Sequence, residues 1–126
     1  MIQQISDSEL ELMKIVWAAG GRAKYAEIME ELANRGSTWQ KNTVITLLSR
    51  LADKGLLKTS KIGRRNEYIA LVTESDYQST QARTLLNKLY AGDAKGLVAT
   101  LIQGEMLTEE DYQELKRCWE SGGDKK

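Results

Sequence analysis

One amphipathic segment, residues 39–55, constrains the fold of this chain more than any other stretch. Its apolar residues recur at i, i+3, i+4 and i+7, the spacing that places them on one face of a helix: Val44, Leu47, Leu48 and Leu51. The opposite face carries small, polar and basic side chains, which can form hydrogen bonds with base edges and phosphates. Lys54 and Gly55 are a cation and a glycine of the kind that commonly end a helix. Both an ordinary surface helix and a DNA-reading helix fit this pattern.

Two further helices are predicted before this segment. Residues 6–9 have the spacing of a capping box and begin a helix that runs to about Ala19. Its apolar stripe is marked by Leu10, Met13 and Trp17 and is widened by Leu12, Ile15 and Val16. After a glycine pair, residues 22–24 can pair as a short strand, and apolar spacing over residues 25–32 predicts the second helix.

A β-hairpin is predicted after the third helix. Residues 56–62 are rich in apolar and β-branched side chains, residues 63–66 form a turn, and residues 67–72 alternate apolar with small or polar side chains. Three helices followed by a hairpin is the order of elements in a winged helix-turn-helix, with residues 39–54 as its recognition helix. Because many small α+β domains share this order, the charge distribution carries much of the argument.

The chain has no net charge, but its charges are unevenly distributed. Residues 37–65 hold seven basic residues against Asp53 alone, a net charge of +6. Residues 1–36 hold four basic and six acidic residues, a net of −2, and residues 66–126 hold seven and eleven, a net of −4. Positive charge gathered on the central helix and the hairpin is the electrostatic footprint of a DNA-binding surface.

Three short helices are predicted after the hairpin, over residues 73–90, 95–103 and 108–120. Their apolar stripes are too short to bury much among themselves, and a second copy of the chain would cover them, giving an isologous homodimer. The alternative is that they fold back on the winged domain. The dimerisation residues predicted on these stripes are Leu85, Leu86, Leu89, Leu97, Val98, Leu101, Ile102, Leu115 and Trp119.

The predicted fold class is therefore mainly α (α+β). A winged helix-turn-helix DNA-binding domain over residues 1–72 is followed by a three-helix dimerisation region over residues 73–126. No apolar run of about 18 residues or signal peptide is present, so neither membrane insertion nor export is expected. The single cysteine, Cys118, excludes an intramolecular disulfide framework and fits the reducing cytoplasm. Without histidine or a glycine-rich phosphate loop, we expect no enzyme, no cofactor and no metal site.

Several motifs along the chain resemble those of one family of bacterial regulators. Residues 6–17 are similar to the opening of the BlaI/MecI/CopY repressors, which are the penicillinase, methicillin-resistance and copper-responsive repressors. The pattern Trp39-x-x-x-Thr43-Val44-x-Thr46-Leu47-Leu48-x-Arg50-Leu51-x-x-Lys54-Gly55 is similar to the recognition-helix signature of that family. The match continues through residues 74–76, 85–90 and 97–102. This resemblance implies a homodimeric transcriptional repressor that binds double-stranded operators with dyad symmetry, often built from TACA and TGTA half-sites.

The predicted DNA-binding residues lie on the central helix and in the turn of the hairpin. They are Lys41, Asn42, Thr43, Ile45, Thr46, Arg50, Lys54, Arg64 and Arg65. Thr43, Thr46 and Arg50 match family positions at the DNA. An exposed isoleucine at position 45 can touch a thymine methyl group, or it can be a tolerated surface residue. The two arginines of the turn suit phosphate or minor-groove contacts.

Two departures from the family bear on how the repressor would be relieved. Copper-responsive members end in a cysteine cluster, whereas this chain has Cys118 alone, and a soft-metal site needs two or more thiolates or imidazoles. In antibiotic-responsive members a membrane-bound sensor protease leads to cleavage of an Asn-Phe bond, and the matching bond here is Thr100-Leu101. Two alternatives remain at this stage: a copper-responsive repressor without the cysteine cluster, and a winged helix that binds only protein.

Overall fold

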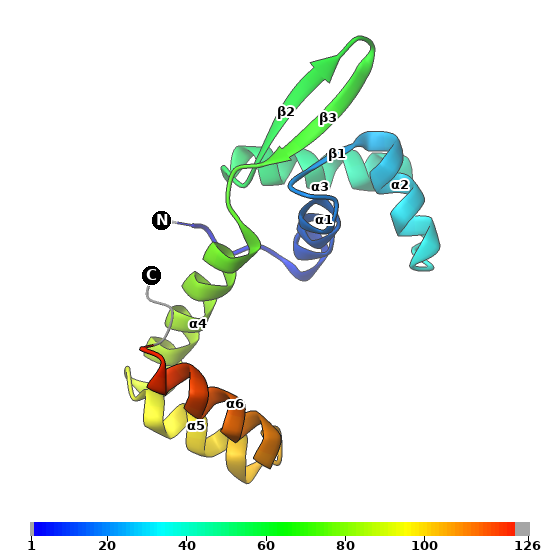
Figure 1. Cartoon of the computed structure of the whole chain (residues 1–126). Helices are drawn as coiled ribbons and strands as arrows, with labels where there is room; N and C mark the ends of the chain where they lie inside the picture. Colours follow the sequence, from blue (N-terminus) through cyan, green and yellow to red (C-terminus); the bar gives the residue numbers. More distant parts are fainter. Residues whose placement is uncertain (1, 123–126) are drawn as a thin grey trace. The chain divides into compact units, whose positions relative to one another are not determined.

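The structure is a computed structural model in which residues 2–122 are described. The first part contains α1 (Asp7–Ala18), β1 (Arg22–Lys24), α2 (Tyr25–Asn34), α3 (Lys41–Asp53), β2 (Leu57–Ile62) and β3 (Arg65–Ala70). It continues into α4 (Glu74–Tyr90), which is followed by α5 (Ala94–Gln103) and α6 (Glu109–Glu120). The three helices and the hairpin confirm the winged helix-turn-helix architecture, mainly α with a small antiparallel sheet (Figure 1).

A capping box starts α1, as its sequence predicts. The Ser6 hydroxyl accepts a hydrogen bond from the Glu9 N–H at 3.1 Å, and the Glu9 carboxylate accepts one from the Ser6 N–H at 2.8 Å. The apolar stripe contains the predicted residues, but its most buried members are not those expected at its centre. Leu12, Met13 and Val16 are fully buried, while Leu10 and Trp17 are only half-buried. Trp17 lies at the edge of the core because its indole N–H donates to the backbone of Val72 at 2.9 Å.

The helix α3 begins at Lys41, two residues after the predicted start, and its four apolar residues are all buried. Its end is a Schellman motif, in which the Leu56 N–H bonds to the Leu51 carbonyl and the Gly55 N–H to the Ala52 carbonyl. Gly55 occupies the left-handed position with a φ of 84°, where a side chain would be strained. The motif turns the chain directly into the first strand of the wing.

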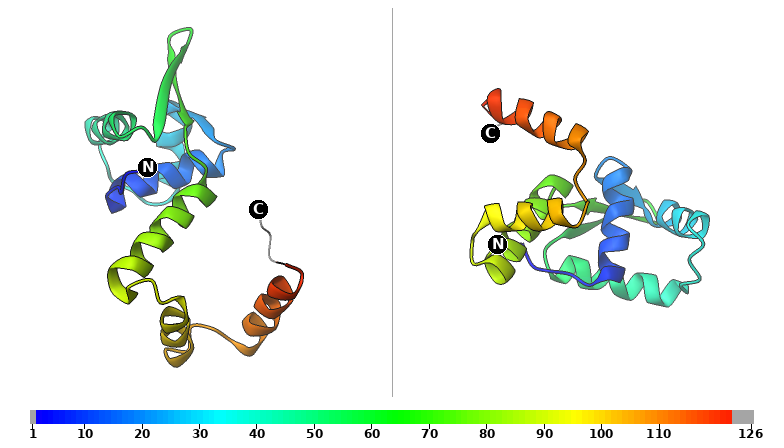
Figure 2. Two further views of the ribbon diagram at one scale, coloured as in Figure 1. Left: turned by 90° about the vertical axis from the view of Figure 1, so that its left-hand side faces the viewer. Right: turned by 90° about the horizontal axis from the view of Figure 1, so that it is seen from below.

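The sheet has the strand order β1-β3-β2, with both pairs antiparallel. Ile62 pairs with Arg65, so the hairpin turn contains only Gly63 and Arg64 rather than the four residues predicted. Gly63 has a φ of 64°, while Arg64 has no positive φ, which is the pattern of a type II′ turn. Arg65 and Asn66 therefore belong to the strand, and the hairpin extends as a ribbon beyond the helices of this part (Figure 2).

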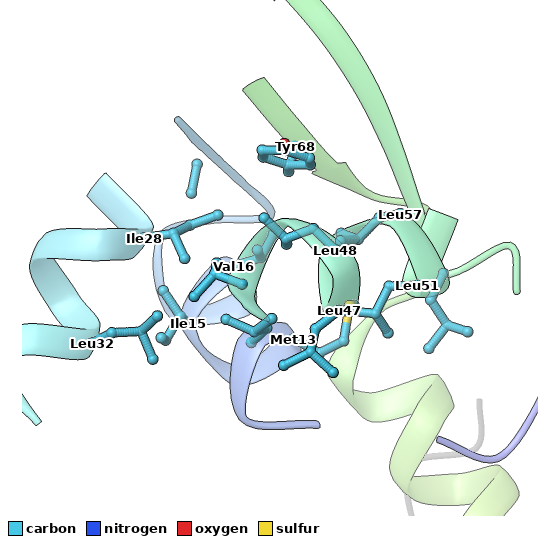
Figure 3. Close-up of a cluster of buried hydrophobic side chains, with 14 of the residues drawn as sticks. Met13, Ile15, Val16, Ile28, Leu32, Leu47, Leu48, Leu51, Leu57 and Tyr68 are labelled. Atoms are coloured by element: carbon cyan, nitrogen blue, oxygen red, sulfur yellow. The ribbon is translucent and has the colours of Figure 1, made fainter. Parts of the chain in front are cut away.

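One hydrophobic core joins α1, α2, α3 and the sheet. Val16 lies among side chains of all three helices, and Tyr68 covers the cluster from β3 (Figure 3). The helix α3 contributes four of the buried residues, so its packed face is fixed by the core of the domain. Burial of this kind is the main stabilising contribution in a small domain.

The chain divides into two compact units, one up to Gln81 and one from Ala82 onward. The first unit extends past the predicted boundary at residue 72 because the start of α4 packs against α1. Tyr77 is buried, and its ring centroid lies 5.8 Å from that of Trp17. In the second unit, α5 and α6 contain no buried residue. Over residues 2–122, no helix combines the length and apolar character needed to cross a membrane.

Candidate nucleic-acid interface

The face of α3 opposite the core is exposed along its whole length. It presents residues predicted to contact DNA: Lys41, Asn42, Thr43, Ile45, Thr46 and Arg50. Ile45, on the same face, keeps 42% of its surface exposed. The buried stripe on one side thus holds these polar and apolar side chains outward on the other.

The wing carries basic residues on both strands and in its turn. Arg64 lies in the turn and Arg65 opens β3, and both are exposed. Two further cations, Lys58 and Lys61, are exposed on β2. They were not among the predicted contacts, and because they are three residues apart in the strand they lie on opposite faces of the wing.

A groove runs between the first turns of α2 and α3 and the wing. Its volume is about 530 Å³, and it is lined by Lys24, Tyr25, Ala26, Lys41, Ile45, Arg64, Arg65, Asn66 and Tyr68. The fold therefore brings Lys41, Ile45 and the two wing arginines together from two separate elements. Asn42, Thr43, Thr46 and Arg50 lie on the exposed face of α3 without lining the groove.

No carboxylate lines this groove, so it is a hollow of positive potential with apolar walls. Burial raises the pKa of Tyr68, and its hydrogen bond with Asn66 only partly opposes that effect. The hydroxyl of Tyr25 is buried, and it has no hydrogen-bond partner among the described residues. Sequence reasoning missed Tyr25 and Lys24, because only the tertiary fold brings the start of α2 beside the wing.

The cations of α3 and the wing are not neutralised by acidic neighbours. Within residues 2–122, none of the following is in an ion pair: Lys41, Arg50, Lys58, Lys61, Arg64 and Arg65. By contrast, Arg22 and Arg35 elsewhere in this unit pair with carboxylates. Of the eight cations of this unit that have no ion pair within residues 2–122, six therefore lie on α3 and the wing, and the other two are Lys14 and Lys24.

Lys54 differs from the other predicted contacts. Its Nζ lies 2.8 Å from Oε1 of Glu9, a carboxylate that is only 2% exposed. The pairing places the Lys54 ammonium against α1, at the C-terminal end of the recognition helix. Burial tends to raise the pKa of Glu9, but hydrogen bonds from Lys54 and Ser6 outweigh it and leave that pKa lowered.

The residues predicted to form a dimer interface leave a large apolar surface uncovered. Leu85, Leu89, Val98, Ile102, Leu115 and Trp119 are exposed, the last of them by 85%, and Leu86, Leu97 and Leu101 are half-buried. Met106 is a further exposed apolar residue of this unit that the prediction omitted. Cys118 is exposed on α6, and no cluster of metal-ligating side chains occurs in the part of the chain that the structure describes.

The bond between Thr100 and Leu101 lies inside α5, not in a loop. The Thr100 hydroxyl donates to the Gly96 carbonyl at 3.1 Å and accepts a hydrogen bond from the Tyr90 hydroxyl at 3.0 Å. A protease that cuts an extended substrate would therefore have to unwind this part of the helix first.

Comparison with known proteins places the chain in a family. The sequence profile described as penicillinase repressor matches residues 5–121. The chain is 35% identical over 125 residues to the penicillinase repressor of Bacillus licheniformis, covering 99% of this chain and 96% of that protein. It is 33% identical over 116 residues to the methicillin resistance regulatory protein MecI of Staphylococcus aureus (strain N315), with 90% of each covered.

Two solved structures resemble the first part of the chain. One is the solution structure of the DNA binding domain of the repressor BlaI, with a TM-score of 0.53, and the other is the Bacillus licheniformis BlaI monomeric form in complex with the blaP half-operator, with a TM-score of 0.52. Each is 43% identical and covers 61% of this chain and 92% of its own. The match of the profile to nearly the whole sequence shows that the chain belongs to the penicillinase repressor family.

Proposed function

We propose that this protein is a homodimeric transcriptional repressor that binds a dyad-symmetric operator through α3 and the basic wing. One observation carries the proposal: in a chain with zero net charge, residues 37–65 hold a net charge of +6, and the six exposed cations of α3 and the wing have no ion pair within residues 2–122. Phosphate contacts supply most of the affinity of such proteins for DNA, so this distribution suits a duplex. The solved complex of BlaI with a half-operator, in a domain 43% identical to this one, supports the same partner.

In the proposed complex, α3 enters the major groove with its first turns toward the bases. Lys41, Arg64 and Arg65 would contact phosphates, and Ile45 and Thr46 would contact base edges. An isoleucine recognises the methyl group of thymine, and a threonine can bond to several bases. The groove between α3 and the wing, lined by cations without any acid, suits one strand of the DNA backbone.

Dimerisation is proposed through the second unit. The exposed leucines of α4 and the apolar residues of α5 and α6 form a surface that a monomer would leave in water. A symmetric dimer would cover it and would present two recognition helices, as a dyad operator requires. Proteolysis at Thr100-Leu101 would cut α5 and remove part of this surface, which offers one route to relief of repression.

Binding to duplex DNA over a salt series tests the proposal directly. The full-length chain should bind a duplex carrying a TACA/TGTA dyad more tightly than a scrambled duplex of the same composition. Its affinity for both should fall steeply with salt, because each phosphate contact releases counterions. A winged helix that binds only protein would show no affinity for either duplex at low salt, and that result would reject the proposal.

A further inference from the structure

A buried ion pair joins the beginning of α1 to the end of α3. Lys54 is the C-terminal capping residue of α3, and its Nζ lies 2.8 Å from Oε1 of Glu9. The same carboxylate oxygen accepts the Ser6 N–H at 2.8 Å, in the capping box of α1. Because Glu9 is 2% exposed, water cannot replace either of these partners without a change in packing. Two helix ends that are distant in the sequence are therefore held by one carboxylate.

This ion pair constrains α3 in a way that its apolar contacts do not. Hydrophobic burial fixes which face of the helix meets the core but has no preferred direction, so it sets the exact axial position and rotation less closely than a directional bond does. A charge-assisted hydrogen bond depends on distance and angle. Among the described residues, Lys54 makes the one side-chain hydrogen bond that connects residues 41–54 to another element. This bond thus fixes the C-terminal end of α3, and the position of that end sets where the exposed face of the helix lies.

We propose that Lys54 and Glu9 are positioning residues for DNA recognition. They hold α3 at the axial position and rotation at which Ile45 and Thr46 meet the bases, and the Lys54 ammonium binds Glu9 instead of a DNA phosphate. This role rests on the proposed function, since it concerns the same helix and the same DNA. In this proposal the two lysines of the motif segment have different roles: Lys54 positions the helix, whereas Lys41 contacts a phosphate.

The energetics favour Glu9 over a phosphate as the partner of Lys54. A lysine that turned to the DNA would leave a buried carboxylate with only the Ser6 N–H as a hydrogen-bond donor. An unpaired buried charge is among the most destabilising features a protein can carry. A DNA phosphate at the protein surface, by contrast, is solvated, and the unpaired cations of the wing can contact it.

The test uses the full-length chain, a duplex with the TACA/TGTA dyad and a scrambled duplex, each over a salt series at a temperature where circular dichroism shows every variant folded. Lys54→Met should weaken binding to the dyad by about tenfold, the equivalent of one disturbed base contact, and leave the scrambled duplex within about twofold. Its salt slope should be unchanged. Lys41→Met is the matched control, which should weaken both duplexes alike and lower the salt slope by about one unit for each lost phosphate contact.

The double variant Glu9→Met/Lys54→Met separates positioning from stability. Replacing a buried ion pair by apolar side chains of similar length restores most of the stability that one single replacement loses. The directional contact is still absent, so the preference for the dyad should remain low. Recovery of that preference together with stability would overturn the proposal, and so would a Lys54→Met variant that behaves like Lys41→Met. If the unaltered chain binds neither duplex, the proposed function itself fails, which is a different result.

Discussion

Replacing Lys54 by methionine should destabilise the first unit well beyond the loss of an ordinary surface ion pair. Removing one partner of a buried pair typically costs about 3–5 kcal/mol, because the other charge is left in the interior. Here the Lys54 side chain is itself 31% exposed, and Ser6 still donates to the Glu9 carboxylate. We therefore expect a loss at or below the lower end of that range, about 2–3 kcal/mol. For a unit of this size that corresponds to a fall in melting temperature of about 10–20 °C.

The matched variant Glu9→Gln should be milder. The glutamine has nearly the same shape and can still accept the Ser6 hydrogen bond, and the Lys54 head can turn into solvent. We expect a loss of about 1 kcal/mol. Thermal unfolding followed by tryptophan fluorescence suits the comparison, because Trp17 and Trp39 are half-buried in the first unit. Equal losses for the two variants, or a loss under about 0.5 kcal/mol for Lys54→Met, would show that Glu9 is solvated and that the pair acts like a surface one.

The dependence of stability on pH provides a second test of the same pair. The pKa of Glu9 in the folded chain is lowered from its ordinary value of 4.5, so the folded state favours the ionised carboxylate. Its contribution should be complete above that value and should be lost as the pH falls through the lower pKa of the folded state. Glu9→Gln should remove this part of the pH dependence, and an unchanged acid profile would contradict the reasoning.

Three further predictions concern binding and assembly. Ile45→Ala should reduce the affinity ratio between dyad and scrambled duplexes by about five- to tenfold or more and leave the salt slope unchanged. Arg64→Ala should weaken binding to both duplexes and lower the salt slope, and competition binding over a salt series measures both variants. A chain truncated after Gln81, where the first compact unit ends, should sediment as a monomer at concentrations where the full-length chain is dimeric; equal dimerisation would contradict the interface. One equivalent of Cu(I) or Zn(II) under reducing conditions should leave operator affinity unchanged, because the chain offers one thiolate, that of Cys118, and no imidazole; specific release from the operator would reveal a missed site.

Local patterns in the sequence were enough to predict the elements of the fold. The stripe of α3 and the capping box of α1 depend on neighbours within one or two helical turns, so periodicity and spacing identify them. The hairpin turn was predicted too long, because Arg65 and Asn66 have little preference for strands in isolation. Pairing with β2 overrides that preference, as the register of Arg65 with Ile62 shows.

Contacts between distant segments could not be predicted in the same way. Glu9 was recognised as a capping residue, but its burial and its bond to Lys54 depend on how α1 crosses α3. The groove likewise depends on the start of α2 lying beside the wing, which no periodicity of Lys24 or Tyr25 indicates. Counting charges by segment predicted part of the interface, because it identified the elements that carry the excess of cations. It did not show which individual cations have no ion pair.

The difference between paired and unpaired cations explains how a chain with no net charge can present a basic surface. Carboxylates of the first unit pair with three of its other cations: Glu67 with Arg22, Glu11 and Glu31 with Arg35, and Glu9 with Lys54 at the C-terminal end of α3. Within the described residues, the cations of the wing have no such partner. Since Coulomb attraction to DNA is screened over about 10 Å at 0.1 M salt, the net charge of the chain matters less than the charge within that distance of the duplex. An electrically neutral chain can therefore keep a positive surface where α3 and the wing would meet phosphates, because the cations of these two elements have no ion pair within residues 2–122.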